Sequence, residues 1–244
     1  DDDDYAENKD EKDDDDDDDE ESPPQQGGEE RRDDHRWTCL LDAAARKSLA
    51  NALKPVLRPK PWVLAYDSIC DGMCLEALYN GANLAPKGPQ ILLVRDDKRN
   101  VAGAFVDEKI RNVGDYYGTG ECFVFELRRR SRSKHHTPPP TLEEDDVRVH
   151  RWVGPGLHDV DESDDRDDFV PALPSIDNDM FVYASAEILG FGSGGGGFAI
   201  RIDEALEFGA SRPCATYGND ASLFDGRDTF PVQRVQLWAF GAFY

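Results

Sequence analysis

Residues 90–106 read QILLVRDDKRNVAGAFV, and this stretch decides the fold class. Two short apolar runs, 90–95 and 101–106, flank a polar turn at 96–100. Apolar runs of this length, bounded by turn residues, are typical of buried strands, and a short polar connection joins such strands into a hairpin. The stretch therefore predicts an antiparallel pair of strands inside a sheet.

Further strands are predicted on both sides of this hairpin. They are expected at 62–66, 121–127, 147–153, 180–184, 198–202 and 234–240. The segment 121–127 is apolar on both faces, with Val124 on one face and Phe123 on the other. Since successive side chains of a strand point to opposite faces, this pattern predicts a central strand that is covered on both sides.

Only short helices are predicted. Leucine and alanine recur at helical spacing through 38–53, and the proline-rich stretch 55–61 ends that helix. Shorter helical segments are expected at 73–79, closed by the Asn-Gly pair 80–81, and at 203–208. About eight strands with few helices favour an α+β fold, mainly antiparallel β, in which two sheets form a β-sandwich with short helices at its periphery.

The acidity of the chain is local. The 244 residues include 51 Asp and Glu against 28 Lys and Arg, for a formal net charge of −23. Residues 1–34 hold 20 of the acidic and four of the basic residues, so 1–36 is predicted to be a disordered acidic tail. Residues 37–244 are predicted to form one domain with charged loop insertions at about 128–146 and 154–179.

Composition excludes several classes of protein. No apolar run reaches the roughly 18 residues of a membrane span, so no membrane insertion is expected. The first residues lack the basic and apolar regions of a signal peptide, and the absent initial Met suggests a piece of a longer protein. Five scattered cysteines are typical of reduced thiols in a cytosolic compartment. Nucleic acid is not an expected partner, because phosphate contacts need clustered Lys and Arg.

Four sequence blocks carry a family resemblance. They read YYGTGECF at 116–123, LGFG followed by a glycine run at 189–197, PCATYGN at 213–219 and VQLWAF at 235–240. In this order and spacing they closely resemble the TLDc domain of the oxidation-resistance proteins, over about 37–240. The resemblance implies a β-sandwich of two antiparallel sheets with flanking helices.

The same resemblance implies a function. It implies a non-enzymatic regulator in oxidative stress protection that binds the soluble sector of the vacuolar proton-pumping ATPase and modulates assembly of that pump. It also implies a cytoplasmic location, with an association with vacuolar or lysosomal membranes through the partner. Nuclear and mitochondrial locations are left open.

The glycine-rich segment provides the candidate partner-binding residues. These are Gly190, Phe191, Gly192, Gly194, Gly195, Gly196 and Gly197. Their Gly-x-Gly-x-x-Gly spacing formally fits a dinucleotide site, but a strand is predicted next, and that site needs a helix N-terminus for the pyrophosphate. We therefore expect a connection between two strands, without a bound cofactor.

Two residues are candidates for an enzymatic alternative. Cys214 offers a thiol for redox chemistry, although burial as a small apolar side chain is the other interpretation. Glu121 offers a carboxylate for hydrolytic acid–base chemistry. A third alternative is a stress-response interaction protein that acts through its charged insertions, such as the basic run 128–134.

The remaining motifs predict structural roles. Cys70 and Cys74 lack a second ligand pair, and an acidic stretch in the second insertion lacks the Gly and Glu of a calcium loop, so no metal site is expected. Cys74 is expected to pack inside its helix, and His150 to lie at the surface or edge of the sheet. Asp203 and Glu204 are expected to cap a helix N-terminus.

Overall fold

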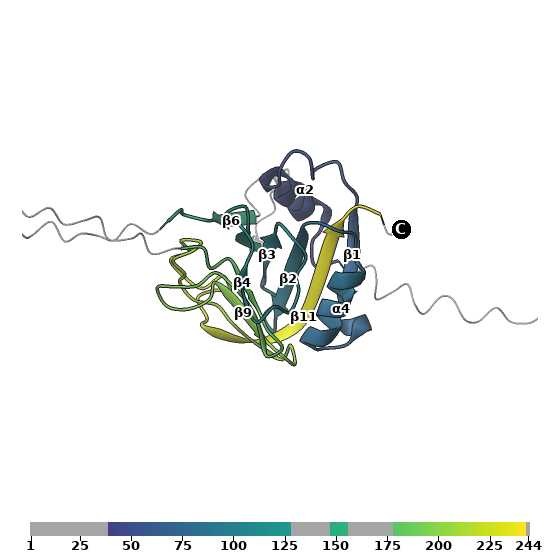
Figure 1. The fold of residues 1–244 in the computed structure, drawn as a ribbon. Coiled ribbons are helices and arrows are strands. Elements are labelled where there is room, and N and C mark those ends of the chain that lie inside the picture. Colours follow the sequence, from purple (N-terminus) through teal and green to yellow (C-terminus); the bar gives the residue numbers. More distant parts are fainter. Residues whose placement is uncertain (1–38, 128–146, 156–177, 243–244) are drawn as a thin grey trace, which may run out of the picture. The chain divides into compact units, whose positions relative to one another are not determined.

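The computed structural model describes residues 39–127, 147–155 and 178–242. The helices are α2 (Ala43–Ala52), α3 (Ser68–Asp71) and α4 (Leu75–Leu84). The strands are β1 (Trp62–Asp67), β2 (Gln90–Asp96), β3 (Val101–Val106), β4 (Asp115–Tyr117), β5 (Phe123–Leu127), β6 (Val147–Arg151), β7 (Val182–Ala184), β8 (Ile188–Phe191), β9 (Ile200–Asp203), β10 (Phe208–Ala210) and β11 (Thr229–Phe240). Figure 1 shows these elements in space.

The strands form two antiparallel sheets that share β11. The order is β4-β7-β8-β9-β10-β11-β2-β3-β5-β6, and β1 pairs with β11 outside this path. The start of β11 pairs with β10, and its later residues pair with β2 on one side and β1 on the other. The predicted fold class, mainly antiparallel β with short peripheral helices, is therefore confirmed.

Two apolar cores lie on opposite faces of the sheet that contains β2. Along β2, Leu92 faces the core between the two sheets, whereas Ile91 faces the core covered by α2. In β5, Val124 and Phe123 alternate in the same way, and β5 lies between β3 and β6. The prediction of a central strand covered on both faces is confirmed.

Helix α2 is shorter than the predicted 38–53. It begins at Ala43 because the carboxylate of Asp42 accepts the backbone N–H of Ala45 at 2.7 Å, which satisfies a free donor of the first turn. Just before the helix, the backbone N–H of Leu40 donates to Oε1 of Gln236 on β11, at 3.0 Å. This hydrogen bond holds the chain against the sheet instead of continuing the helix.

Helix α4 is longer than the predicted 73–79, and Gly81 does not end it. The helix continues to Leu84, and Gly81 lies where the helix meets β1. A Cβ at Gly81 would come within 2.7 Å of the carbonyl oxygen of Ala65. The absence of a side chain at Gly81 therefore permits the close approach of α4 to β1. The Asn-Gly pair by itself predicts the end of a helix and does not indicate this contact.

The helix predicted at 203–208 is wrong, because this segment is the tight turn between β9 and β10. The carboxylate of Asp203 accepts the backbone N–H groups of Glu207, at 2.9 Å, and Phe208, at 3.1 Å. Asp203 therefore caps a hairpin turn, as aspartate often does. The expected helix N-terminus for Asp203 and Glu204 does not exist.

Cys74 differs from its prediction, and the prediction for His150 is confirmed for its edge position only. Cys74 is the N-cap of α4, where its Sγ accepts the N–H of Ala77 at 3.5 Å, so it does not pack inside the helix. His150 lies on β6, the last strand of the sheet, but its side chain is buried. Burial lowers the pKa of His150, and Glu126, 3.9 Å away between Nε2 and Oε1, only partly offsets this.

Strand boundaries also shift. The structure starts β5 at Phe123, ends β6 at Arg151, starts β7 at Val182, places β9 at Ile200–Asp203 and starts β11 at Thr229. Three strands of three or four residues, β4, β8 and β10, are absent from the predicted eight. Such short strands carry too few residues for a clear alternating pattern.

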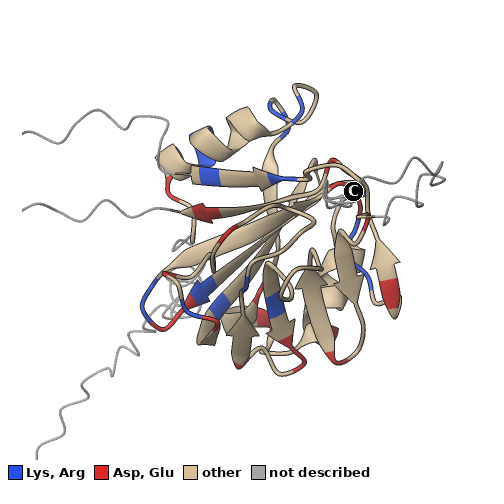
Figure 2. Ribbon diagram, turned by 90° about the vertical axis from the view of Figure 1, so that its left-hand side faces the viewer, with Lys and Arg blue, Asp and Glu red and all other residues tan. Residues whose placement is uncertain are grey.

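Several predicted segments lie outside the described residues. They are the acidic tail 1–36, the first insertion with its basic run, and 156–177 of the second insertion. In the described part, most of the strand length is uncharged, and charged positions gather near strand ends and in turns (Figure 2). None of the described helices has the length and hydropathy that crossing a bilayer requires.

Candidate functional site

Residues 192–199 connect β8 to β9, so the predicted connection between two strands is confirmed for most of the glycine-rich segment, whereas its first two residues, Gly190 and Phe191, belong to β8 itself. No helix begins between these two strands. Gly190 belongs to β8 and pairs with Arg201 of β9. A Cβ at Gly190 would come within 2.5 Å of the ring of Phe198, so this glycine makes room for an aromatic side chain. The geometry of a dinucleotide cradle, a strand followed by a helix N-terminus, is therefore missing here.

The segment after β8 rests on the PCATYGN block at 213–219. The N–H of Ala215 donates to the carbonyl of Gly194, and the N–H of Thr216 to the carbonyl of Ser193, each at 3.2 Å. In return, the N–H of Ser193 donates to Oγ1 of Thr216 at 3.1 Å. These hydrogen bonds join two sequence blocks into one layered loop structure.

Gly192 is the closest point of this contact. Its φ is +72°, in the left-handed region that favours glycine. A Cβ there would come within 2.4 Å of Sγ of Cys214 and 2.8 Å of the ring of Tyr217. No side chain fits at position 192 without displacing one of these two residues.

Cys214 is buried, with 3% of its surface exposed. Its Sγ lies 3.3 Å from the carbonyl oxygen of Ser193, beneath Gly192. A reactive thiol must be accessible and ionised, and this environment provides little access. The surroundings of Cys214 fit the second interpretation of the sequence, a small buried side chain that packs against the loop.

The candidate partner-binding residues differ in exposure. The three buried residues are Gly190, Phe191 and Gly192. The half-buried or exposed residues are Gly194, Gly195, Gly196 and Gly197, and we call these four the glycine tip. Gly195 and Gly196 are the exposed pair, so a partner has access to the glycine tip and not to the beginning of the segment.

The YYGTGECF block packs beside the same structure. Gly118 has a φ of +98°, and a Cβ there would come within 3.0 Å of Sγ of Cys122. The thiol of Cys122 donates to Oδ1 of Asp107 at 3.0 Å. Burial raises the pKa of Cys122 to about 12, so this thiol stays protonated at neutral pH. Like Cys214, it is placed for packing.

Two residues that the sequence analysis did not single out fasten the ends of the second insertion here. The indole N–H of Trp152 donates to the carbonyl of Asn178 at 2.7 Å. The side-chain amide of Asn178 donates to the carbonyls of Gly154, at 3.0 Å, and Ala215, at 3.2 Å. No local pattern marks Asn178 within its polar surroundings, so only the fold identifies it.

An apolar side chain borders the PCATYGN block. Val153 is 61% exposed, and its backbone N–H donates to the carbonyl of Thr216 at 3.2 Å. A Cβ at Gly218 would lie within 2.6 Å of Val153. Val153 therefore adds exposed apolar surface to the block that carries the glycine tip.

Glu121 does not join this site. Its Oε1 lies 3.2 Å from Nζ of Lys54, and both side chains are about half exposed. An exposed ion pair of this kind is screened by water. Cys214 is buried beneath Gly192, so the two candidates for enzymatic chemistry have separate surroundings. Among the described residues, no three His, Cys, Asp or Glu side chains gather in a way that could hold a metal ion.

These observations define a class of protein: an antiparallel β-sandwich whose glycine-rich strand connection is supported by a second loop of small residues. The family model for the TLDc domain matches residues 37–146 and 164–241. Since this match covers well over half of the sequence, the chain belongs to the TLDc domain family.

Individual relatives agree with this assignment. The chain is 29% identical over 201 residues to oxidation resistance protein 1 of Xenopus tropicalis, covering 82% of this chain and 18% of that protein. It is 28% identical over 218 residues to oxidation resistance protein 1 of Gibberella zeae, covering 83% and 66%. It is 26% identical over 203 residues to human nuclear receptor coactivator 7, covering 83% and 17%. The matched region is thus less than a fifth of two of these three relatives.

Proposed function

We propose that this chain is a TLDc-type regulator in oxidative stress protection that acts by binding and not by catalysis. Its partner is the soluble sector of the vacuolar proton-pumping ATPase, whose assembly it modulates from the cytoplasmic side. Family membership and the names of the relatives support the link to oxidative stress. The partner and the location are inferred from the family resemblance of the four sequence blocks.

One observation carries the proposed mode of binding. The glycine tip is accessible, yet hydrogen bonds from Ala215 and Thr216 hold the loop in place. A partner can approach the backbone of Gly195 and Gly196 without meeting a side chain. Because the loop is already ordered by its support, little conformational entropy is lost on binding.

The enzymatic alternatives have less support. A redox enzyme needs an accessible thiolate, and Cys214, the candidate for this role, is buried. A hydrolase needs a carboxylate aimed at its substrate, whereas Glu121 pairs with Lys54 at the surface. The interaction protein that acts through charged insertions depends on residues outside the described ranges.

A charged side chain on the glycine tip tests the proposal. Gly195 has a φ of +73°, which aspartate tolerates better than most residues, and the nearest atom to an added Cβ is 3.6 Å away. We expect Gly195→Asp to keep the fold and to weaken binding of the purified full chain to the pump's soluble sector at least tenfold. Biolayer interferometry with the immobilised soluble sector measures this affinity.

Gly226→Asp is the matched control. Gly226 has nearly the same φ, +72°, is exposed, and has no atom within 4 Å of an added Cβ. It lies in a turn outside the glycine-rich segment, so this variant should bind as the unmodified chain does. Equal affinity of all three proteins would rule out the glycine tip as the contact. No binding by the unmodified chain would overturn the proposed partner.

A further inference from the structure

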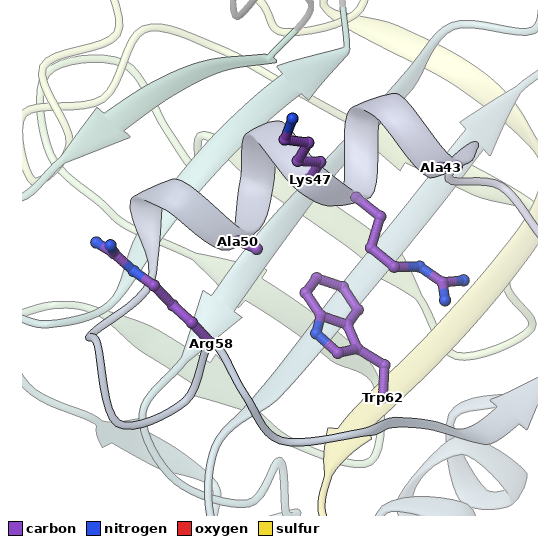
Figure 3. A pocket seen from close by; sticks show the side chains of 6 residues that line it. Ala43, Lys47, Ala50, Arg58 and Trp62 are labelled. Atoms are coloured by element: carbon purple, nitrogen blue, oxygen red, sulfur yellow. The ribbon is translucent and has the colours of Figure 1, made fainter.

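A shallow hollow lies beside α2, far along the chain from the glycine tip. It has a volume of about 450 Å³ and is lined by Ala43, Arg46, Lys47, Ala50, Arg58 and Trp62. Four of these residues follow the i, i+3, i+4, i+7 spacing of one helix face. Figure 3 shows the indole of Trp62 beneath that face of α2, with Arg58 near the end of the helix.

The floor of this hollow is low and apolar. Ala43 and Ala50 provide only methyl groups at the two ends of this helix face, and Arg46 and Lys47 lie between them. Trp62 adds a partly buried aromatic ring. Alanine methyl groups beside an aromatic ring fit an apolar side chain of a peptide better than a small, strongly hydrated ion.

The rim of the hollow is basic and contains no acidic side chain. Arg58 donates to the carbonyls of Leu53 and Asn51, each at 3.0 Å, so it is committed to the end of α2. Lys47 is exposed, and it has no ion pair or side-chain hydrogen bond with the residues that the structure describes. Lys47 is therefore a cation available to a carboxylate from outside.

Two donors next to the hollow lack acceptors. Arg46 lies over the rings of Trp62 and Trp238, with its Cζ at 5.7 and 5.2 Å from their centroids. Nε of Arg46 and the indole N–H of Trp238 are buried, and neither has a hydrogen-bond partner within the described ranges. Because the protein itself covers these two atoms, a ligand in the hollow does not reach them. Nη2 of Arg46 donates to Sγ of Cys39 at 3.4 Å, so Arg46 is held against the two rings and Lys47 is the cation that a ligand meets.

We propose that this hollow is a docking site for an acidic peptide segment of a partner protein. A carboxylate of that segment pairs with Lys47, while a neighbouring apolar side chain lies against Trp62 and Ala50. Seven helical residues span about 10 Å, which matches three extended peptide residues. The proposal is independent of the glycine tip, because α2 and the β8–β9 connection are different elements.

A peptide titration tests this proposal on the full chain. The probe is a fluorescent hexapeptide of alternating glutamate and leucine, and the control probe has glutamine in place of glutamate. We expect fluorescence anisotropy to show binding of the glutamate peptide that weakens with added salt. Lys47→Glu should raise its Kd at least tenfold, and the glutamine peptide should bind at least tenfold more weakly.

Lys87→Glu is the matched control, since Lys87 is also exposed and lies outside the hollow. Its Kd should stay within twofold of the unmodified chain. An equal loss in Lys87→Glu, or equal binding of both peptides, would overturn the proposal. Displacement by millimolar inorganic phosphate at constant ionic strength would identify a phosphate site instead.

A further experiment tests whether the chain's own acidic residues occupy the hollow. A variant with asparagine at positions 13–19 removes seven aspartates from the chain. Binding that is unchanged in this variant supports a site for a separate partner. Binding that appears only in this variant would identify the chain itself as the occupant and would overturn the proposal.

Discussion

At the scale of single residues, glycines determine how closely the glycine-rich segment and the PCATYGN block at 213–219 approach each other. Gly192 approaches Cys214 and Tyr217 so closely that an added Cβ would lie 2.4 Å from a sulfur atom. Gly226 has the same φ, +72°, but faces open space. This pair of glycines separates the effect of the backbone from the effect of packing.

Replacing these glycines by alanine should therefore destabilise the protein to different degrees. We expect Gly226→Ala to lower the free energy of unfolding by about 1 kcal/mol, because an L-residue is strained at positive φ. Gly192→Ala adds overpacking and should lower it by about 3 kcal/mol. Urea unfolding monitored by tryptophan fluorescence measures both values. Equal losses would show that Cys214 and Tyr217 move aside without cost.

At the scale of elements, a buried ion pair joins β1 to β11. Nε of Arg234 donates to Oδ1 of Asp67 at 3.0 Å, and the amide of Gln236 donates to Oδ2 at 2.9 Å. Burial alone would raise the pKa of Asp67, but these hydrogen bonds outweigh it and hold the pKa below the ordinary value of 3.8. Both charged side chains are at most 3% exposed.

This lowered pKa predicts a dependence of stability on pH. The stabilisation by Asp67 is complete above about pH 4 and is lost as the pH falls through the lower pKa of the folded state. Asp67→Asn leaves Arg234 without its counter-charge, so we expect a loss of about 3 kcal/mol at pH 7. The difference from the unmodified chain should shrink below pH 4. Urea unfolding between pH 2.5 and 7 measures it.

Asp97→Asn is the control for this prediction. Asp97 also pairs with an arginine, with 2.8 Å between its Oδ1 and Nη1 of Arg227, but it lies at the surface. Water screens such a pair, so the variant should unfold close to the unmodified chain. If Asp67→Asn behaved as Asp97→Asn does, the buried pair would not stabilise the junction of β1 and β11.

At the scale of the whole molecule, β11 couples the two sheets. It pairs with β10 in one sheet and with β2 and β1 in the other, and both cores use its residues. Cys122 and Cys214 come from different sequence blocks, but both belong to the core between the sheets. We therefore expect these two thiols to become accessible together.

Thiol labelling tests this coupling and the redox alternative. In the native protein, iodoacetamide should modify the exposed Cys70 and leave Cys122 and Cys214 unmodified. With increasing urea, the two buried thiols should be labelled at the same midpoint, as mass spectrometry of peptides shows. Labelling of Cys214 in the native protein, together with peroxide consumption that Cys214→Ser abolishes, would support the alternative that the protein is a redox enzyme.

How much of the structure the sequence predicts depends on how far apart in the sequence the contacting residues are. The β2–β3 hairpin and the core strand β5 follow from apolar patterns within a few residues, and the glycine-rich segment is correctly predicted as a strand connection. The predicted roles of Gly81 and Asp203 are wrong, because a contact with β1 sets the role of Gly81 and a hairpin turn sets that of Asp203. Local sequence patterns also do not predict which residues of the glycine-rich segment are buried and which form the glycine tip.

By itself, then, the sequence determined the antiparallel β class, the family and the blocks that form the candidate site. Alternating apolar residues and glycines influence the backbone conformation of nearby residues, so their effect on secondary structure can be predicted from the sequence. The tertiary structure alone decided that Cys214 is buried, that Glu121 pairs with Lys54 and that Asn178 fastens an insertion. These roles arise from contacts between residues far apart in the chain, and only the packing of both sheets around β11 brings those residues together.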